Sequence, residues 1–353
     1  MAIVVISFDG VGDKEFERLA KDKKNYPNIA KFMEQSIYQS GVKSVFVSNT
    51  QPAHVTISTG KLPSEHGIVS NHPRPDSARW VKRSRCIKAE TIWERAGRSG
   101  MTTAAIFWPL TCGAAIRWNI PGMCLGSHLL QLRSLIKHGT KLLGITPGAT
   151  QPYLDNFATA VACNLLRSRE ADLTLVHFLA YDAIRHRVGG ASEELDVARQ
   201  SLDRNLGKLL DVAGERTVLI CSDHSHLDVR KTINLMEIYG RDIYEQCGGS
   251  AFFKIAPANV ENYHWFGRFL NEAEMGESGY SEHAICGIAA KVGYAFGTVP
   301  YKSNHGYPAD YENYRVFYAI RAGKGNYLAK HEDIGIDIDI RDIYSIILRE
   351  LGI

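Results

Sequence analysis

Residues 3–10 read IVVISFDG, an almost uninterrupted run of apolar and β-branched residues that ends in an aspartate and a glycine. Such a run is typical of a strand that is buried on both faces, as strands are in parallel sheets. Two later runs have the same character: LTLVHFL at 173–179 and TVLIC at 217–221. The three runs therefore predict strands of one largely parallel sheet.

Helical patterns alternate with these strands along the chain. Pro27 lies near the start of an apolar helical pattern that extends to residue 40, and Ser192 can cap a long helix with leucines on one face. The other expected elements are helices at 91–100, 156–167 and 342–351, and strands at 42–47 and 103–107. This alternation predicts an α/β fold in which helices cover both faces of the sheet.

Two stretches do not follow the alternation. Residues 111–150 are richer in glycine, proline and threonine, and residues 229–300 mix aromatic residues and glycines without a clear repeat. We interpret both stretches as insertions into a single domain that spans residues 1–353.

The composition excludes several classes of protein. The chain has 353 residues, of which 45% are hydrophobic, and its net charge is only +3, from 41 basic and 38 acidic residues. A large core is therefore possible, and nothing favours a polyanion as partner. No apolar run reaches the roughly 20 residues of a membrane span, and the first residues show no leader pattern. The seven scattered cysteines are typical of reduced thiols. We expect a soluble cytoplasmic protein that binds neither nucleic acid nor membranes, and the sequence does not predict its oligomeric state.

Aspartates follow the three predicted strands, and two of them have a histidine nearby. The residues are Asp9, Asp182 with His186 four positions later, and Asp223 followed by His224. Because the carboxyl ends of parallel strands share one edge of a sheet, these side chains should converge there. Carboxylates and imidazoles suit a divalent metal such as zinc, and the set is too large for one tetrahedral ion. Two alternatives stay open: each aspartate could be a helix N-cap, and Asp182 with His186 could be an exposed i,i+4 pair.

Residues 48–72 read SNTQPAHVTISTGKLPSEHGIVSNH, and this segment resembles a known family. It is similar to the nucleophile region of the type I phosphodiesterases/nucleotide pyrophosphatases of the alkaline phosphatase superfamily. There a threonine precedes an aromatic-Pro-Asn-His run and then TGxxPxxHGI. Further matching pieces follow in the family's order: SFDG at 7–10, TIWERAGRSGMTTAAIFWP at 91–109, Asp182 with His186, SDH at 222–224 and NHGY at 304–307.

The resemblance implies an alkaline-phosphatase-like core that binds two zinc ions, or other divalent metals in their place. The ligands would be Asp9, Asp223 and His224 for one ion, and Asp182, His186 and His305 for the other. Thr50 would lie between the ions, as nucleophile and as a further ligand, and Asn71 would donate its amide to a phosphate oxygen. A metal is needed because a threonine hydroxyl is a poor nucleophile at neutral pH. The alternative is that Thr50 is a turn residue and Asn71 a loop or cap residue.

The function implied is that of a metal-dependent phosphodiesterase or nucleotide pyrophosphatase. Thr50 would attack a small phosphoester substrate, and the phospho-threonine intermediate would then be hydrolysed. One alternative keeps the metal site but changes the substrate to a phosphomonoester or to a phosphonate such as phosphonoacetate. A sulfatase is disfavoured because such enzymes need cysteine or serine at the position of the nucleophile. A catalytically inactive metal-binding protein is the alternative outside enzymes.

Departures from the family pattern bear mainly on the substrate. Gln51 stands where nucleotide-cleaving members have an aromatic residue, so a base would have to stack elsewhere, for example on Phe178, Tyr181 or Trp108. The only cationic neighbours visible in the sequence are Arg185 and Arg187, which we expect to point away from the metals. We expect His54 and His66 to orient loops. We expect His177 and His226 to face the substrate or to support ligands.

Overall fold

The computed structural model describes residues 2–73, 77, 80–122, 152–257, 266–323 and 338–353. A seven-stranded sheet runs through its centre in the order β2-β15-β6-β1-β5-β3-β4. The run β6-β1-β5-β3-β4 is parallel, whereas β15 is antiparallel to both β6 and β2. The strands are β1 Ile3–Phe8, β2 Ile37–Val42, β3 Thr103–Ile106, β4 Trp118–Ile120, β5 Leu173–Phe178, β6 Thr217–Cys221 and β15 Val316–Arg321. The predicted α/β fold with a mostly parallel sheet is confirmed.

Strand β1 is the centre of the core because both of its faces are covered. All six residues from Ile3 to Phe8 are buried, and β1 is paired in register with β5 and β6. Val4, Ile6 and Phe8 belong to one hydrophobic cluster, whereas Ile3 and Val5 belong to another on the opposite face. The continuous apolar run at the start of the sequence is thus explained by burial on both faces.

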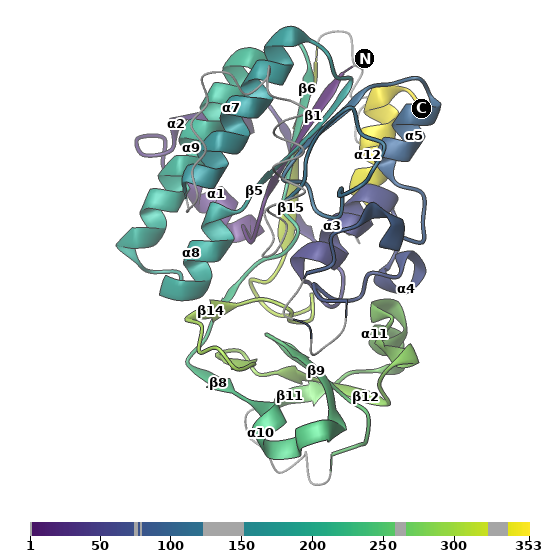
Figure 1. The fold of residues 1–353 in the computed structure, drawn as a ribbon. Coiled ribbons are helices and arrows are strands. Elements are labelled where there is room, and N and C mark those ends of the chain that lie inside the picture. The colour runs from purple at the N-terminus through teal and green to yellow at the C-terminus, as the bar shows by residue number, and fades with distance from the viewer. Residues whose placement is uncertain (1, 74–76, 78–79, 123–151, 258–265, 324–337) are drawn as a thin grey trace.

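Helices form a layer on each side of the sheet (Figure 1). One layer supplies apolar side chains to the first cluster and consists of α1 Asp13–Lys21, α2 Pro27–Glu34, α7 Tyr153–Ser168, α8 Ala180–Val188 and α9 Glu193–Ala213. The other layer consists of α3 Thr50–Thr59, α5 Ile92–Arg98 and α12 Asp342–Leu351, with the short α4 Pro63–His66 and the 3₁₀ turn η1 Ser84–Cys86 nearby. Ser192 caps α9 as expected, because its side chain accepts a hydrogen bond from the backbone N–H of Glu194.

The prediction for residues 27–47 is wrong in its boundaries. Helix α2 ends at Glu34, and β2 covers Ile37–Val42, so the helix is shorter than expected and the strand lies earlier than 42–47. Ile37 continues the apolar spacing of the helix, but it pairs with Ile320 of β15. Pairing with a strand far along the chain therefore overrides the local helical pattern.

Residues 227–304 build smaller sheets that lie beyond the carboxyl ends of the central strands, in the lower part of Figure 1. The strands are β7 Leu227–Asp228, β8 Lys231–Ile233, β9 Ile243–Cys247, β10 Ser250–Phe253, β11 Phe266–Phe269, β12 Cys286–Ala290, β13 Tyr294–Phe296 and β14 Ser303–Asn304. The helical segments are α10 Leu235–Tyr239, η3 Gly240–Asp242, α11 Glu272–Ser278 and η5 Tyr280–Glu282. The expected insertion at 229–300 falls in this region, whereas most of the one at 111–150 lies outside the described residues.

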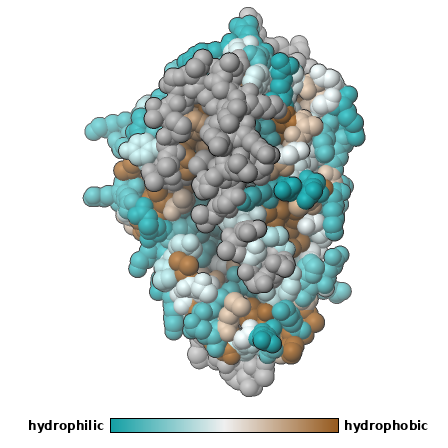
Figure 2. Space-filling view, in the orientation of Figure 1, coloured by the Kyte–Doolittle hydropathy of each residue, from teal (hydrophilic) through white to brown (hydrophobic). Residues whose placement is uncertain are grey.

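The surface of the described residues is mixed in character. Figure 2 shows hydrophilic residues along both side edges of one face and hydrophobic residues mainly toward its middle. Among the helices that the structure describes, none has both the length and the apolar character that crossing a membrane requires.

Candidate metal centre and active site

The three aspartates singled out in the sequence meet at one edge of the central sheet. Asp9 directly follows β1, Asp223 follows β6, and Asp182 lies in the first turn of α8, which follows β5. Because β1, β5 and β6 are parallel neighbours, their carboxyl ends lie side by side. The carboxylates group with histidines into clusters whose ligand atoms lie within 4.8 Å of one another.

The first cluster contains Asp9, Asp223, His224 and Thr50. His224 Nε2 lies 3.3 Å from Asp9 Oδ1 and 3.3 Å from Asp223 Oδ2, and 3.4 Å from Thr50 Oγ1. Asp223 Oδ1 accepts a hydrogen bond from the backbone N–H of Gly10, and Asp9 Oδ2 lies 2.9 Å from His177 Nε2. Each carboxylate therefore has one oxygen held by the protein and one oxygen directed toward His224.

The directed oxygens fit a bound cation. Asp9 Oδ1 and Asp223 Oδ2 are both buried, and neither has a hydrogen-bond partner in the described part of the chain. A buried carboxylate oxygen without a partner destabilises the folded chain unless a cation or a hydrogen-bond donor binds it. Ligand atoms around a tetrahedral zinc ion, at bond lengths of about 2.0–2.1 Å, lie about 3.3 Å apart. The spacing in this cluster is therefore compatible with a divalent metal ion such as zinc.

The second cluster contains Asp182, His186 and His226, and the ring of His305 lies beside it, with its centroid 4.9 Å from that of His186. The Nδ1–H groups of His186 and His305 donate to the backbone carbonyls of Ser303 and Ser48, at 2.9 and 3.1 Å. A carbonyl can only accept, so Nδ1 of each ring carries the proton and Nε2 is the nitrogen available to a metal. His186 Nε2 lies 3.4 Å from Asp182 Oδ1.

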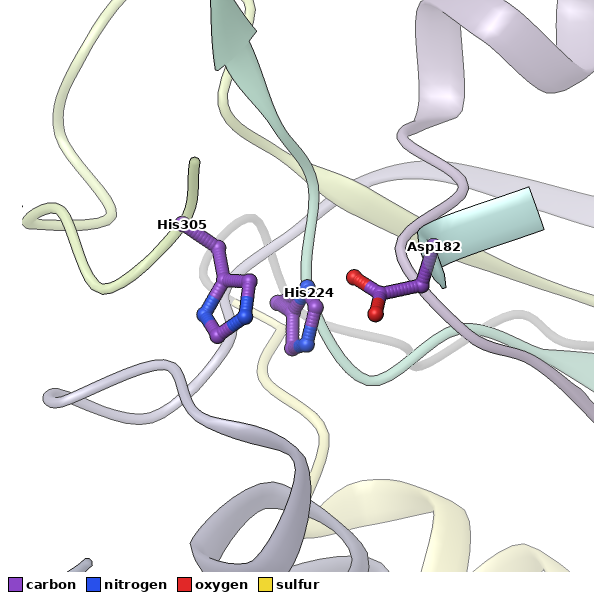
Figure 3. A group of neighbouring side chains, drawn as sticks. All are labelled: Asp182, His224 and His305. Atoms are coloured by element: carbon purple, nitrogen blue, oxygen red, sulfur yellow. The ribbon is translucent and has the colours of Figure 1, made fainter. Parts of the chain in front are cut away.

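The two clusters lie against each other. Figure 3 shows the rings of His305 and His224 side by side, with the Asp182 carboxylate directed toward them. The two ring centroids are 3.9 Å apart and the rings are stacked. Residues from both expected ligand sets therefore meet in one site, and Asp182, His224 and His305 form a further group with metal-ligand spacing.

Burial and neighbouring charges shape the protonation of these groups. Burial, together with the charges of Asp223 and Asp182, holds the pKa of Asp9 well above its ordinary value. Burial opposes ionisation of Asp182, but its histidine neighbours outweigh burial and the pKa of Asp182 lies well below its usual range. Burial, together with His224 and His186, lowers the pKa of His305 far enough to keep the ring neutral at pH 7. Crowded carboxylates beside imidazoles are the donor set that suits a divalent cation.

Thr50 occupies the first position of helix α3, where backbone N–H groups and the helix dipole favour negative charge. The histidine of the same segment holds this turn in place. His54 Nδ1–H donates to the carbonyl of Thr50 at 2.8 Å, and His54 Nε2 lies 2.9 Å from Ser7 Oγ of β1. Likewise, His66 contacts Thr56 and the backbone of Ile68, so both histidines orient loops as expected.

Asn71 is joined to the same turn. Its Oδ1 accepts a hydrogen bond from the backbone N–H of Gln51 at 2.8 Å. This contact turns the amide so that its NH₂ group is the end available to a ligand, which is the orientation that donation to a phosphate oxygen requires.

The site opens into two cavities that share Thr50. The larger has a volume of about 980 Å³ and is lined by Thr50, Asn71, Asp182, His186 and His305, together with residues of the smaller sheets. The smaller has a volume of about 250 Å³ and is mainly apolar, with Gln51, Trp80, Phe107, Pro109 and Leu110 among its lining residues. Thr50 therefore lies between a polar cavity and an apolar one.

The cationic neighbours differ in part from the expectation. The Arg185 guanidinium donates to Tyr181 Oη at 2.7 Å and Arg187 pairs with Glu194, so both are engaged elsewhere, as expected. Arg241 and Lys254 nevertheless line the larger cavity. The sequence did not suggest them because no motif marks them: Arg241 lies in η3 and Lys254 directly follows β10.

The expected stacking residues are not at the site. Phe178, Tyr181 and Trp108 are fully buried, and none of them lines either of the two cavities. They fill the core instead, where Trp108 Nε1 donates to Ser58 Oγ at 2.9 Å. The aromatic residues that do line the larger cavity are Trp80, Tyr244, Phe296 and Tyr301.

Two supporting carboxyls were missed by the sequence reasoning. Glu245 of β9 accepts hydrogen bonds from Ser70 Oγ at 2.6 Å and Tyr280 Oη at 2.7 Å, and so ties the loop of Asn71 to the smaller sheets. Asp155 of α7 accepts hydrogen bonds from the backbone N–H groups of Leu179 and Ala180, at the start of α8. The sequence holds no motif for either contact, because each joins segments distant in the chain.

Comparisons with known proteins show the family of the chain. The family model of type I phosphodiesterase / nucleotide pyrophosphatase matches residues 3–307, and the chain belongs to this family. Venom phosphodiesterase 2 of Crotalus adamanteus is 24% identical over 205 residues, which are 55% of this chain and 23% of the venom protein. Ectonucleotide pyrophosphatase/phosphodiesterase family member 7 of Mus musculus is 22% identical over 257 residues, which are 67% of this chain and 53% of the mouse protein. The chain thus spans about a quarter to a half of the length of these relatives.

Solved structures share the fold along the whole chain. Murine ectonucleotide pyrophosphatase / phosphodiesterase 5 matches with a TM-score of 0.71 at 16% identity, covering 100% of this chain and 95% of the murine chain. Phosphonoacetate hydrolase from Sinorhizobium meliloti matches with a TM-score of 0.70 at 15% identity, covering 99% of this chain and 95% of the bacterial chain.

Proposed function

We propose that the chain is a metal-dependent phosphodiesterase in which Thr50 is the nucleophile and two zinc ions bind beside it. The main support for this proposal is the environment of Thr50 Oγ1. It lies 3.4 Å from His224 Nε2, which in turn lies 3.3 Å from the unpaired oxygens of Asp9 and Asp223. A hydroxyl at this point can be activated and can reach a phosphorus atom in the cavity.

The residues that would hold the metals are Asp9, Asp223, His224 and Thr50 for one ion and Asp182, His186 and His305 for the other. Bound metal would lower the pKa of the Thr50 hydroxyl and stabilise negative charge on the phosphoryl oxygens. The N-terminus of α3 adds a fixed positive potential at the same hydroxyl. The Asn71 amide would donate to a phosphoryl oxygen and bind the charge that grows in the transition state.

The covalent chemistry takes place on Thr50. Thr50 Oγ attacks phosphorus, the bond from phosphorus to the leaving alcohol breaks, and a phospho-threonine forms. Water then cleaves the bond from phosphorus to Thr50 Oγ and regenerates the hydroxyl. His54 keeps the turn fixed through both steps, because it binds the Thr50 carbonyl on one side and Ser7 on the other.

The two cavities favour a diester over a monoester. A diester carries two organic groups, and Thr50 lines both a polar cavity of about 980 Å³ and an apolar one of about 250 Å³. One group can enter each cavity while phosphorus lies beside Thr50. A monoester would leave one cavity to water.

A phosphonate or monoester substrate is the second candidate, and a specific observation favours it. Arg241 and Lys254 line the larger cavity, so an additional negative charge on the substrate would find cations there. Both side chains are exposed, which limits the strength of such an interaction.

The test uses two variants and two substrates. Thr50→Ala should still hold both ions through the six remaining ligands and lose turnover by a factor of at least about 10³, because no side chain can form the covalent intermediate. Thr50→Ser is the matched control and should keep a measurable part of the activity. The nitrophenyl diester of thymidine monophosphate should have a higher kcat/KM than nitrophenyl phosphate at the same pH.

Two results would contradict the proposal. Turnover of Thr50→Ala close to that of the unaltered protein would remove Thr50 from the mechanism. A tenfold preference for the monoester, equivalent to about 1.4 kcal/mol in the transition state, would favour the second candidate.

A further inference from the structure

His177 lies behind the Asp9 carboxylate and takes no part in the ligand set described above. It is the fifth residue of β5, which neighbours β1, and it is buried. Its Nδ1–H donates to the carbonyl of Phe107 at 3.2 Å, because a carbonyl can only accept. Its Nε2 lies 2.9 Å from Asp9 Oδ2, so one proton lies in that contact, on either atom. The contact leaves Asp9 Oδ1 directed toward His224.

His226 makes a similar contact with the Asp182 carboxylate, through Oδ1, the oxygen that also lies 3.4 Å from His186 Nε2. It follows β6 and is buried, and its Nε2 lies 2.6 Å from Asp182 Oδ1. Its Nδ1 lies 3.1 Å from Ser303 Oγ, which anchors the far side of the ring.

Gly10 makes room for this pair. Its φ is +74°, and a Cβ at this position would lie 2.8 Å from His226 Nε2 and 3.1 Å from Asp182 Oδ1. The backbone of Gly10 also donates to Asp223 Oδ1. The close contact between imidazole and carboxylate thus depends on a glycine beside the first cluster.

We propose that His177 and His226 are positioning residues, one for each metal centre, which fix the orientation of the Asp9 and Asp182 carboxylates. The inference rests on the proposed two-metal site. It assigns no further ligand, because the 2.6 Å and 2.9 Å contacts are hydrogen-bond distances, shorter than the spacing of about 3.3 Å between two ligands of one zinc ion.

The physical reason is preorganisation. A carboxylate with one oxygen held by an imidazole does not have to be reoriented when a cation binds. The parallel sheet creates both pairs in the same way. His177 of β5 reaches the aspartate that follows β1, and His226, after β6, reaches the aspartate that follows β5.

The test measures metal affinity directly, by titrating zinc into the metal-free full chain in the presence of a competing chelator. His177→Ala should raise one of the two zinc dissociation constants by about 10–100-fold, and His226→Ala should raise the other by a similar factor. The double variant should raise both dissociation constants. His283→Ala is the matched control, because His283 is exposed, stacks on Tyr244 and belongs to none of the metal-ligand groups, and it should change neither constant.

Conservative variants separate positioning from ligation. His226→Gln keeps an N–H that can donate to Asp182, yet an amide is a poor zinc ligand, so its zinc affinity should stay within about threefold of the unaltered chain. A Gln variant as weak as the Ala variant would overturn the positioning role in favour of direct ligation. Thermal melts of the metal-free variants verify that each chain is folded.

Failure of this inference is distinguishable from failure of the proposed function. If the unaltered chain binds two ions and both Ala variants bind them equally well, the positioning role is wrong and the two-metal site stands. If both Ala variants weaken both constants equally, the effect is a general loss of structure, which also overturns the assignment. If the unaltered chain binds no divalent ion, the proposed function fails, and the positioning roles fail with it.

Discussion

Gln51 is a buried amide at the side of Thr50 that faces the smaller cavity. The residue is only 2% exposed, and its Oε1 has no hydrogen-bond partner in the described part of the chain. The surrounding wall is mainly apolar. A ligand group with a single N–H or O–H donor would satisfy this oxygen, whereas a purely apolar group would leave it unpaired.

We therefore predict that Gln51→Leu changes the choice of substrate more than the chemistry. Diesters whose small substituent carries a donor should lose about 3–10-fold in kcat/KM, which corresponds to one hydrogen bond. Diesters with an apolar aryl substituent should be cleaved equally well or better. Equal losses for both kinds of substituent, in parallel kinetic assays, would show that Gln51 does not contact the substrate.

Asn71→Ala should lower kcat by about 10²–10³-fold while zinc content stays unchanged, because the variant removes a donor to the transition state and no ligand. The variant also leaves the backbone N–H of Gln51 without its 2.8 Å partner, so the turn at Thr50 should loosen. Steady-state kinetics together with elemental analysis test the prediction. A loss of zinc, or a rise in KM with kcat unchanged, would contradict it.

At this scale the sequence reasoning was uneven for a physical reason. Asp9, Asp182 and Asp223 could be grouped from sequence because each follows a strand whose apolar run is visible locally. The contact between Glu245 and Ser70 could not be predicted from sequence, because this hydrogen bond joins two segments 175 positions apart. Lone histidines such as His226 also carry no pattern that separates a metal ligand from a residue that supports one.

At the scale of elements, helix α8 is held by a carboxylate from another helix. Asp155 of α7 accepts hydrogen bonds from the first backbone N–H groups of α8, at 2.9 and 3.0 Å. Since α8 carries Asp182 and His186, this contact fixes the direction in which the second cluster points. Burial raises the pKa of Asp155 to about 7, although the two N–H donors oppose the rise.

The sign of the resulting pH dependence follows from linkage. A carboxyl with a raised pKa binds its proton more tightly in the folded chain, so its contribution to stability is present below about pH 4 and is lost as the pH rises to about 7. Relative to Asp155→Asn, the unfolding free energy of the unaltered chain should thus fall by an amount on the order of 3 kcal/mol between pH 4 and 7. Above pH 7 it should fall no further. Urea melts of both metal-free chains across this range provide the measurement, and a pH-independent difference would refute the prediction.

Elements defined by local signals were predicted well. Strand β1 and helix α12 have the predicted boundaries, and α9 begins after the predicted cap, because apolar runs, helical spacing and a capping serine are properties of neighbouring residues. Strand β2 was misplaced because its position is decided by β15, which begins at Val316. No window of local sequence contains that information.

For the whole molecule, the two clusters imply that metal and fold stabilise each other. Metal-free protein must bury Asp9 and Asp223 with unpaired oxygens, whereas cations that bind only the folded chain stabilise it by mass action. Zinc at a hundred times its dissociation constant should add about 2.7 kcal/mol per site. Chelation should therefore lower the melting temperature by several degrees, measured by calorimetry, and a variant lacking both Asp182 and Asp223 should show little change.

The proposed ligands lie far apart along the chain, with Asp9 near its start and His305 in the segment after β14. During synthesis, a ribosome would release the first strand long before the last imidazole existed, so the bimetallic pocket is among the final features to assemble. Binding of two zinc ions would then report complete folding, since only chains whose central sheet and smaller sheets have both formed could retain two ions. The metal content of the chain would in this way distinguish fully folded molecules from partly folded ones.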